Sequence, residues 1–240
     1  MSDSIHTSGY DRTRAFTLIE LLTVMSIIVL LAALVLGIAN HANTKASMSR
    51  ATTEIHSFSA AIEAYKVDNG TVPRAVTASG STGTSRTDIL NPQKDWQPTD
   101  QKYKDASNYL YQALSGFQPD ANGNPGVLSP TTHYTTFQPT QLEIYSSAKG
   151  DTTKNPGSPY MYIVDPFGFS YGYSTAYVAK VEEADKKDNP NAKPDEGFGY
   201  NPTFDLWSTA GYATSGRSTP TNNANASPAA VYSSLWIKNW

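Results

Sequence analysis

The sequence contains no cysteine and few charged residues. The absence of cysteine excludes disulfides, thiolate nucleophiles, iron–sulfur clusters and zinc sites built on thiolates. Charged residues make up 16% of the 240 residues and the net charge is −3. A broad basic surface that would neutralise nucleic-acid phosphates is therefore not expected, and no nucleic-acid partner is predicted. The histidines are scattered without metal-ligand spacing: His6, His41, His56 and His133.

Proline is absent from residues 16–72, and most of the strong hydrophobicity lies in this interval. Between Leu21 and Ile38 there are 18 consecutive residues without a charge. A membrane-spanning helix needs ~20 mainly apolar residues, whereas the apolar region of a secretory signal peptide is shorter and ends in a small-residue cleavage site. Cleavage near Ala33 or Ala39 is the alternative, but the length of the run favours a retained membrane helix.

A single carboxylate, Glu20, lies near the start of the apolar run. In one interpretation it lies at the level of the lipid headgroups, where its charge is hydrated. In the other it has a cationic partner inside the membrane, because a carboxylate that faces lipid is costly. A cut between Ala15 and Phe16 would create an α-amino group four residues before Glu20. That ammonium would supply the partner, either within one chain or between neighbouring chains.

The residues from Arg14 to Leu22, RAFTLIELL, resemble the prepilin cleavage and methylation motif of type IV pilins and type II secretion pseudopilins. The resemblance implies that prepilin peptidase cuts between Ala15 and Phe16 and N-methylates Phe16. It also implies that Glu20 pairs with the N-terminus of a neighbouring subunit during assembly. Ala15 stands where the family usually has glycine. Basic residues flank both ends of the apolar run, so a periplasmic C-terminal domain is predicted from the resemblance rather than from charge.

Beyond the membrane segment the apolar residues become periodic, which predicts that the same helix continues over residues 40–70. The periodic stripe consists of Ala51, Ile55, Phe58, Ile62 and Tyr65. Steps of four and three residues place the stripe on one helix face, away from polar residues such as Glu54. This face is expected to pack on a globular domain, with a coiled-coil seam as the alternative. Asp68-Asn69-Gly70, followed by Pro73, predicts the end of the helix.

Residues 71–240 predict a globular α+β domain with insertions near 74–104 and 116–158. Residues 75–88 are small and polar and indicate a loop. A short helix is expected over 105–115, with Asp105 as its N-cap, and one strand over 141–145. The run 160–164, a turn at 165–168 and the run 169–180 predict a β-hairpin.

Near the end of the chain, a strand is expected at 204–208, and residues 231–240 are expected to be extended or loop-like. Residues 181–197 are charged and contain proline. Their acidic side chains lack the spacing of an EF-hand calcium loop, so we expect a solvated loop there.

Four further segments resemble the major pseudopilin of type II secretion. They are the helix end 61–73, the turn Asp165–Gly168, the stretch Phe204–Gly211 and the ending Ile237–Trp240. The resemblance implies a pilin-like α+β fold, in which a long N-terminal helix packs on a small antiparallel sheet. The family's calcium site lies in the loop after the third segment. Residues 211–240 contain no Asp or Glu, so calcium is expected to be absent or weakly bound.

The prediction is therefore a structural protein with a leader at 1–15, a membrane helix at 16–39, an amphipathic helix at 40–70 and a globular domain at 71–240. The resemblance implies a single-pass inner-membrane protein that assembles with copies of itself into a filament in the periplasm or at the cell surface. Its other partners would be prepilin peptidase, further pseudopilins and an inner-membrane assembly platform. A type II secretion pseudopilus is favoured over a type IV pilus for adhesion, motility or DNA uptake, because the sequence has no C-terminal disulfide.

The alternative class of function is a membrane-tethered enzyme or ligand-binding domain. Its polar candidates are His133, Tyr134 and Asp165, but no spacing relates them to a catalytic arrangement. Tyrosine and tryptophan side chains in the second half of the chain offer a sugar-binding platform. Sheet-core packing explains the same aromatic residues, and no enzymatic activity is predicted.

Overall fold

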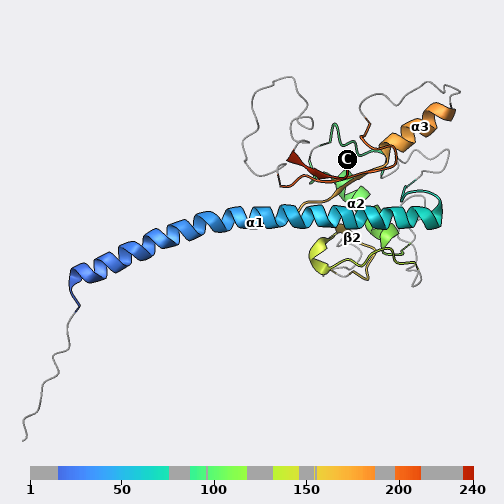
Figure 1. Ribbon diagram of the computed structural model, residues 1–240. Coiled ribbons are helices and arrows are strands. Elements are labelled where there is room, and N and C mark those ends of the chain that lie inside the picture. Colours follow the sequence, from blue (N-terminus) through green and yellow to red (C-terminus); the bar gives the residue numbers. More distant parts are fainter. Residues whose placement is uncertain are drawn as a thin grey trace, which may run out of the picture. The chain divides into compact units, whose positions relative to one another are not determined.

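The computed structural model describes residues 16–75, 87–95, 97–117, 132–145, 154, 156–186, 198–211 and 235–240, with only the backbone of 36–40 and 183–186. The elements are α1 (Leu18–Asn69), α2 (Gln101–Leu114), η1 (Pro139–Gln141), β1 (Leu142–Ile144), β2 (Met161–Ile163), β3 (Gly172–Ser174), α3 (Ala176–Lys186), β4 (Asp205–Ser208) and β5 (Ile237–Lys238). The chain forms two compact units, Met1–Lys45 and Ala46–Trp240, and α1 contributes residues to both (Figure 1).

In the second unit, α1 packs its apolar stripe into the core, as the periodicity predicts. Four stripe residues are at most 2% exposed: Ala51, Ile55, Phe58 and Ile62. The Phe58 ring lies 5.4 Å from the Phe137 ring and meets the Tyr171 ring edge-on at 5.6 Å. The helix ends at Asn69, and Gly70 adopts a left-handed conformation with φ of 75°. The predicted helix end is thus confirmed, because a residue without Cβ takes this conformation without strain.

The prediction that Glu54 lies away from the packed face is wrong. Glu54 is only 7% exposed. Its Oε1 accepts a hydrogen bond from Arg50 Nε at 2.9 Å, and its Oε2 accepts one from the Tyr171 hydroxyl at 2.8 Å. A buried carboxylate needs such partners to replace its hydration. Glu54 therefore fixes α1 against the core through a polar contact at the edge of the apolar stripe.

Helix α2 begins one turn earlier than predicted, because Asp100, not Asp105, precedes its first residue, Gln101. It packs against β2 and β3. The Ser107 hydroxyl donates to the Ile163 carbonyl at 3.0 Å and accepts from the Ile163 N–H at 2.9 Å. Asn108 Nδ2 donates to the Met161 carbonyl at 2.6 Å. These bonds tie α2 to the backbone of β2, where the Ile163 carbonyl also accepts the Tyr171 N–H at 3.2 Å.

The hairpin predicted over 160–180 is confirmed only at its tip, around the turn at 165–168. Strand β2 pairs with β1, whereas β3 pairs with β4, and both pairings are antiparallel. A single bridge, Val164↔Ser170, joins the two runs. The second run then leaves the sheet, because residues from Ala176 onward form α3. The charged segment 181–197 is accordingly helical as far as Lys186, and residues 187–197 lie outside the described residues.

The second sheet has the order β3-β4-β5. Strand β4 confirms the strand predicted at 204–208, and β5 lies within the terminal stretch 231–240, of which 231–234 is outside the described part. In the second unit, α2 and the strands lie along the last part of α1 (Figure 1). One long helix with small antiparallel sheets and shorter helices is an α+β, pilin-like arrangement, as expected.

Strand β3 carries a glycine whose replacement tests the packing of the second sheet. A Cβ on Gly172 would lie 2.1 Å from Cε2 of the fully buried Trp207. We expect Gly172→Ala to lower the free energy of unfolding by about 2–3 kcal/mol, because the indole cannot move without disturbing the core. Thermal unfolding of the chain in detergent measures the effect.

Gly168→Ala is the matched control. Gly168 has a φ of 84°, with open space around the added Cβ. We expect Gly168→Ala to lower the free energy of unfolding by about 1 kcal/mol, from backbone strain alone. Equal losses in the two variants would show that Trp207 does not fill the space above Gly172.

Candidate functional site at the start of the apolar helix

The start of α1 is closed by a reciprocal cap between Thr17 and Glu20. Thr17 precedes the first helical residue, Leu18. The backbone N–H and the hydroxyl of Thr17 both donate to Glu20 Oε2 at 2.8 Å, and the Glu20 N–H donates to Thr17 Oγ1 at 3.3 Å. A helix start leaves backbone N–H groups without partners, and a Thr-x-x-Glu box satisfies two of them. The cap therefore fixes both where α1 begins and where the Glu20 carboxylate lies.

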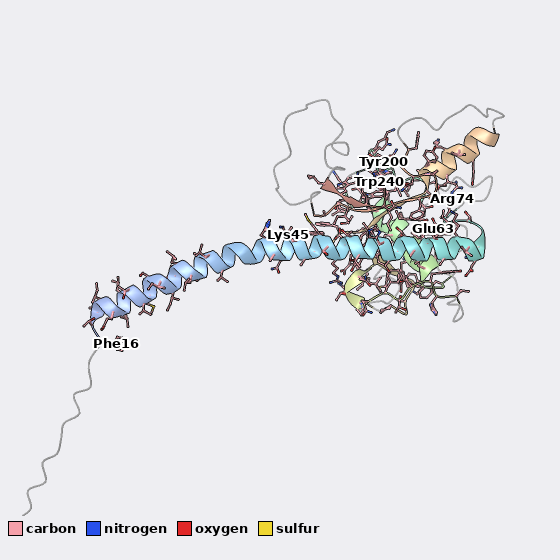
Figure 2. The ribbon with its side chains drawn as sticks, in the orientation of Figure 1. Phe16, Lys45, Glu63, Arg74, Tyr200 and Trp240 are labelled. Carbon is pink, nitrogen blue, oxygen red and sulfur yellow. The ribbon has the colours of Figure 1, made fainter. Side chains whose placement is uncertain are left out.

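The cap uses one carboxylate oxygen and leaves the other available. Both donors reach Glu20 Oε2, and none of the hydrogen bonds described in the first unit involves Oε1. Phe16 lies directly before the cap, outside the helix, and is 82% exposed. Figure 2 shows its ring at the beginning of the helical ribbon. Ala15, on the other side of the predicted cleavage point, lies outside the described residues.

Behind the cap, α1 presents apolar side chains in every direction. The 18 residues Leu18–Val35 have a mean hydropathy of 2.7, and none is buried within the described structure. The large apolar side chains from Phe16 to Val35 are between 52% and 82% exposed. Exposed apolar surface of this extent marks a lipid or protein contact. By length and composition, this helix is able to cross a membrane.

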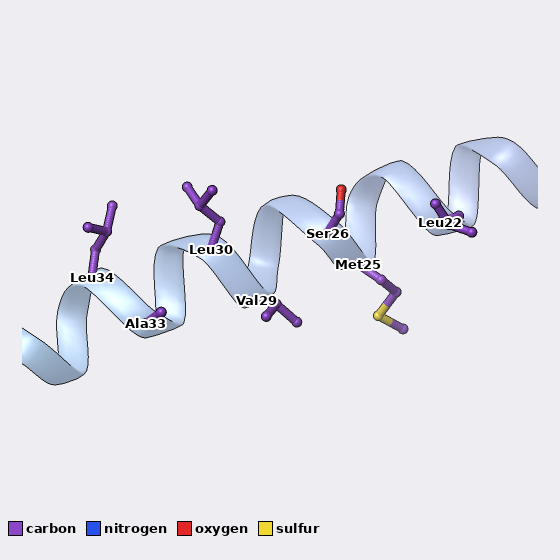
Figure 3. Close-up of a pocket in the computed structure, with 7 residues that line it drawn as sticks. All are labelled: Leu22, Met25, Ser26, Val29, Leu30, Ala33 and Leu34. Carbon is purple, nitrogen blue, oxygen red and sulfur yellow. The ribbon is translucent and has the colours of Figure 1, made fainter.

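One strip of this helix is continuous and almost entirely apolar. It consists of Leu22, Met25, Ser26, Val29, Leu30, Ala33 and Leu34. Figure 3 shows Ser26, Leu30 and Leu34 along one edge of the strip and Met25 and Val29 along the other. The Ser26 hydroxyl donates to the Thr23 carbonyl at 2.8 Å, so its polarity is satisfied within the helix. The strip thus offers an apolar surface in which Ser26 and Ala33 are the small side chains.

The polar residues of the alternative enzyme interpretation have separate structural roles. Asp165 is 2% exposed; its Oδ1 accepts the N–H groups of Phe167 and Phe169, and its Oδ2 accepts the Ser208 hydroxyl at 2.5 Å. Burial raises the pKa of Asp165, and these hydrogen bonds act in the opposite direction. The Tyr134 hydroxyl accepts a hydrogen bond from Asn69 at the end of α1, whereas His133 is exposed.

The aromatic residues of the suggested sugar-binding platform lie mostly inside the fold. Tyr171, Tyr173 and Trp207 have no exposed surface, and Tyr162 is 8% exposed. Burial raises the pKa of Tyr171 and Tyr173. These side chains form the core and are not accessible to a ligand.

The acidic segment 181–197 supplies an ion pair to the fold. Glu182 Oε1 lies 2.7 Å from Arg74 Nη1, and the same guanidinium contacts Asp88 Oδ2 at 3.0 Å. Among the residues that the structure describes, no three His, Cys, Asp or Glu side chains are grouped as a metal site would require. Asp188, Asp195, Glu196 and most of 211–240 lie outside that part.

The sequence analysis found Phe16 and Glu20 but missed Thr17. The signal was present, because a threonine followed three residues later by a glutamate and an apolar run is a helix-start pattern. The structure shows that Thr17 supplies two of the hydrogen-bond donors that position Glu20.

Comparison with known proteins agrees with this site. Residues 11–36 match the family model described as the prokaryotic N-terminal methylation motif. No curated protein and no solved structure matches the chain. The matched range contains Ala15, Phe16, Thr17, Glu20 and nearly all of the apolar helix segment. It supports a type IV pilin-like prepilin, and the motif is one of structural rather than catalytic proteins.

Proposed function

We propose that this chain is a structural subunit of a type II secretion pseudopilus that assembles through its N-terminal helix to drive protein export. The observation that carries the proposal is the arrangement of Phe16, Thr17 and Glu20 at the start of an exposed, predominantly apolar helix segment. This arrangement coincides with the methylation motif at residues 11–36. The start of α1 thus has what a prepilin needs: a bond for cleavage, a residue for methylation and a carboxylate for assembly.

Cleavage of the Ala15–Phe16 bond by prepilin peptidase would change the charge at the helix start. The new α-amino group on Phe16, N-methylated, lies one residue before the cap. Glu20 Oε2 is already held by Thr17, whereas Oε1 takes no part in the cap. The ammonium of a neighbouring subunit is the natural donor, because a charge pair lowers the cost of burying either charge in an apolar surrounding.

Assembly then follows from the uncovered surface of the helix. Copies of the chain would bury the apolar strip from Leu22 to Leu34 against one another as they leave the membrane. Small side chains such as Ala33 allow helices to approach closely. The partners are other copies of this chain, further pseudopilins and the inner-membrane assembly platform. The second unit would lie in the periplasm, and the chain would be a single-pass inner-membrane protein before assembly.

Contacts in the second unit support a pseudopilin rather than a pilin of the type IV pilus. Three of the segments that resemble the major pseudopilin meet one another. Asp165, in the turn Asp165–Gly168, accepts a hydrogen bond from Ser208, in the stretch Phe204–Gly211. Asn239, in the ending Ile237–Trp240, donates its N–H to the Leu206 carbonyl of that stretch at 3.1 Å. Residues that are far apart in the sequence thus form one interlocked structure. A type IV pilus subunit remains the second candidate, because the methylation motif is common to both.

The first test is the mass and N-terminal residue of the chain purified from host membranes. We expect a mature protein that begins with N-methylated Phe16. Edman sequencing and intact mass spectrometry distinguish this from other products. A retained Met1, or a cut near Ala39, would contradict the proposed processing and remove the basis for the role of Glu20 in assembly.

The second test separates the charge of Glu20 from its role in the cap. Glu20→Gln keeps an amide oxygen for Thr17 but removes the charge, so we expect it to lower incorporation into filaments roughly tenfold or more. Thr17→Ala keeps the charge and loses the hydroxyl of the cap, so its effect should be smaller. Sheared-filament yield, normalised to the chain in membranes, measures both.

Thr17→Ser, which retains the hydroxyl, is the control and should assemble normally. Normal assembly of Glu20→Gln would show that the local cap, not charge pairing between subunits, is what Glu20 supplies. A type II secretion assay with the Glu20→Gln variant then distinguishes the two filament types. Export of folded proteins should fail if the filament is a pseudopilus and continue if it is a pilus.

The third test concerns calcium, which we propose is absent or weakly bound. Residues 211–240 contain no carboxylate side chain, and Glu182 is engaged with Arg74. A ligand present at 100 times its Kd stabilises the folded state by about 2.7 kcal/mol, a shift of roughly 5 °C or more for a domain of this size. Thermal unfolding with excess calcium and with chelator should give midpoints within about 1 °C of each other. A rise of 5 °C with calcium would contradict the proposal.

A further inference from the structure

The first residue of β4 is a carboxylate enclosed by a turn. Asp205 is 1% exposed. Its Oδ2 accepts the Tyr200 N–H at 3.0 Å and its Oδ1 accepts the Asn201 N–H at 2.9 Å. A Cβ on Gly199, whose φ is 153°, would lie 2.6 Å from Asp205 Oδ2. The turn 199–201 therefore covers the carboxylate at a distance that a larger residue at position 199 would prevent.

Residues 235–240, here named the strap, cover the turn 199–201 from outside. The Tyr200 and Trp240 rings are stacked, with centroids 4.6 Å apart and planes at 10°. Figure 2 shows these two side chains next to each other. Asn201 Nδ2 donates to Asn239 Oδ1 at 3.2 Å. The backbone N–H groups of these turn residues bind Asp205, while their side chains hold the strap.

The strap is also paired with β4 itself. Lys238 is opposite Trp207 in the antiparallel register. Asn239 Oδ1 accepts the Leu206 N–H at 2.9 Å, and the Asn239 N–H donates to the Leu206 carbonyl. The Trp240 ring meets the Trp207 ring edge-on at 5.9 Å. Because the strap contacts both β4 and the turn, its departure would leave the turn without its outer support and would open Asp205 to water.

No ammonium contacts the Asp205 carboxylate among the described residues. The nearest elements place their cations over aromatic rings. Lys238 lies over the rings of Tyr200 and Trp240, at 5.7 and 5.1 Å. Lys94 and Lys180 lie over the Phe198 ring. The phenols of Tyr177, from α3, and Tyr200 are the other titratable groups around the turn. Burial raises the pKa of Asp205 to about 6, and the two N–H bonds act in the opposite direction.

We propose that Asp205 is a proton-controlled latch that holds the strap more tightly in mildly acidic surroundings than at neutral pH. The docked strap keeps the carboxylate away from water, and this loss of hydration favours the neutral form. Release of the strap hydrates the carboxylate and favours the charged form. A proton on Asp205 therefore opposes release. In a filament subunit exposed to the periplasm or the medium, such a latch would stiffen the β4 edge when the surroundings become acidic.

Proton linkage gives the direction and the size of the pH effect on release of the strap. A carboxyl group whose pKa is raised in the docked state stabilises that state most at low pH, and this stabilisation is lost as the pH rises through about 6. With a pKa of about 6 in the docked state and the ordinary aspartate pKa of 3.8 in the released state, the equilibrium constant for release should be roughly tenfold smaller at pH 5 than at pH 7.

Hydrogen exchange of the processed full-length chain in detergent micelles tests the latch. The amides of β5 and Asn239 report on the strap, and those of α2 serve as an internal reference. After correction for the intrinsic pH dependence of exchange, we expect strap protection to be roughly tenfold greater at pH 5 than at pH 7. Protection of α2 should change much less.

Asp205→Asn is neutral at every pH and should abolish the pH dependence of strap protection, while its amide nitrogen cannot accept one of the two turn N–H groups. If circular dichroism shows that this variant does not fold, the Tyr200→Ala variant tests the proposal instead. It removes the stacking that couples the turn to the strap, and the pH effect should fall below about threefold. Equal strap protection at both pH values in the unmodified chain, or an undiminished pH effect in either folded variant, would overturn the proposal.

Discussion

The structure depends on α1 satisfying its own backbone hydrogen bonds from Leu18 to Asn69. A helix is the form in which a single segment leaves no backbone group unpaired, so it tolerates an apolar surrounding that a loop or an isolated strand does not. Only its ends need other partners. Thr17 and Glu20 supply them at the start, and Gly70 allows the chain to turn away at the finish. With the backbone settled, side chains alone decide what surrounds each part of α1. They are predominantly apolar on all sides from Leu18 to Val35 and apolar on one face in the second unit.

The second unit illustrates how a protein with few charges builds a core from short strands. Its described strands have two to four residues, so ladders alone leave many backbone groups unpaired. Hydroxyl and amide side chains take their place: Ser107 bonds both polar groups of Ile163, and the Tyr173 hydroxyl donates to the Pro73 carbonyl at 2.6 Å. Neutral groups of this kind need less compensation on burial than ionised ones. The abundance of serine, asparagine and tyrosine in the sequence therefore has a structural reason.

Features set by local chemistry were predictable from the sequence, whereas features set by tertiary contacts were not. The α1 stripe, the end at Gly70, the turn at Asp165 and strand β4 follow from periodicity and turn residues. The burial of Glu54 depends on Tyr171, which is 117 residues away in the chain, and no local pattern contains that information. The predicted hairpin is limited to its turn and one bridge for the same reason, because β2 and β3 pair with β1 and β4 rather than with each other. At the site, Phe16 and Glu20 were found by motif, and Thr17 was missed although its spacing to Glu20 is a local signal.

The start of α1 reconciles two demands on Glu20 that conflict. A helix start favours a carboxylate, because its exposed N–H groups and dipole are positive, whereas an apolar surrounding disfavours any charge that lacks a partner. A glutamate whose two carboxylate oxygens were both bonded within its own cap would have no acceptor left for a donor from another chain. Because both Thr17 donors converge on Oε2, the cap fixes the position of the carboxylate while Oε1 is left to a donor from outside. The same residue thus caps the start of the helix and keeps one carboxylate oxygen outside the cap, for which a neighbouring subunit would supply the donor in the filament proposed above.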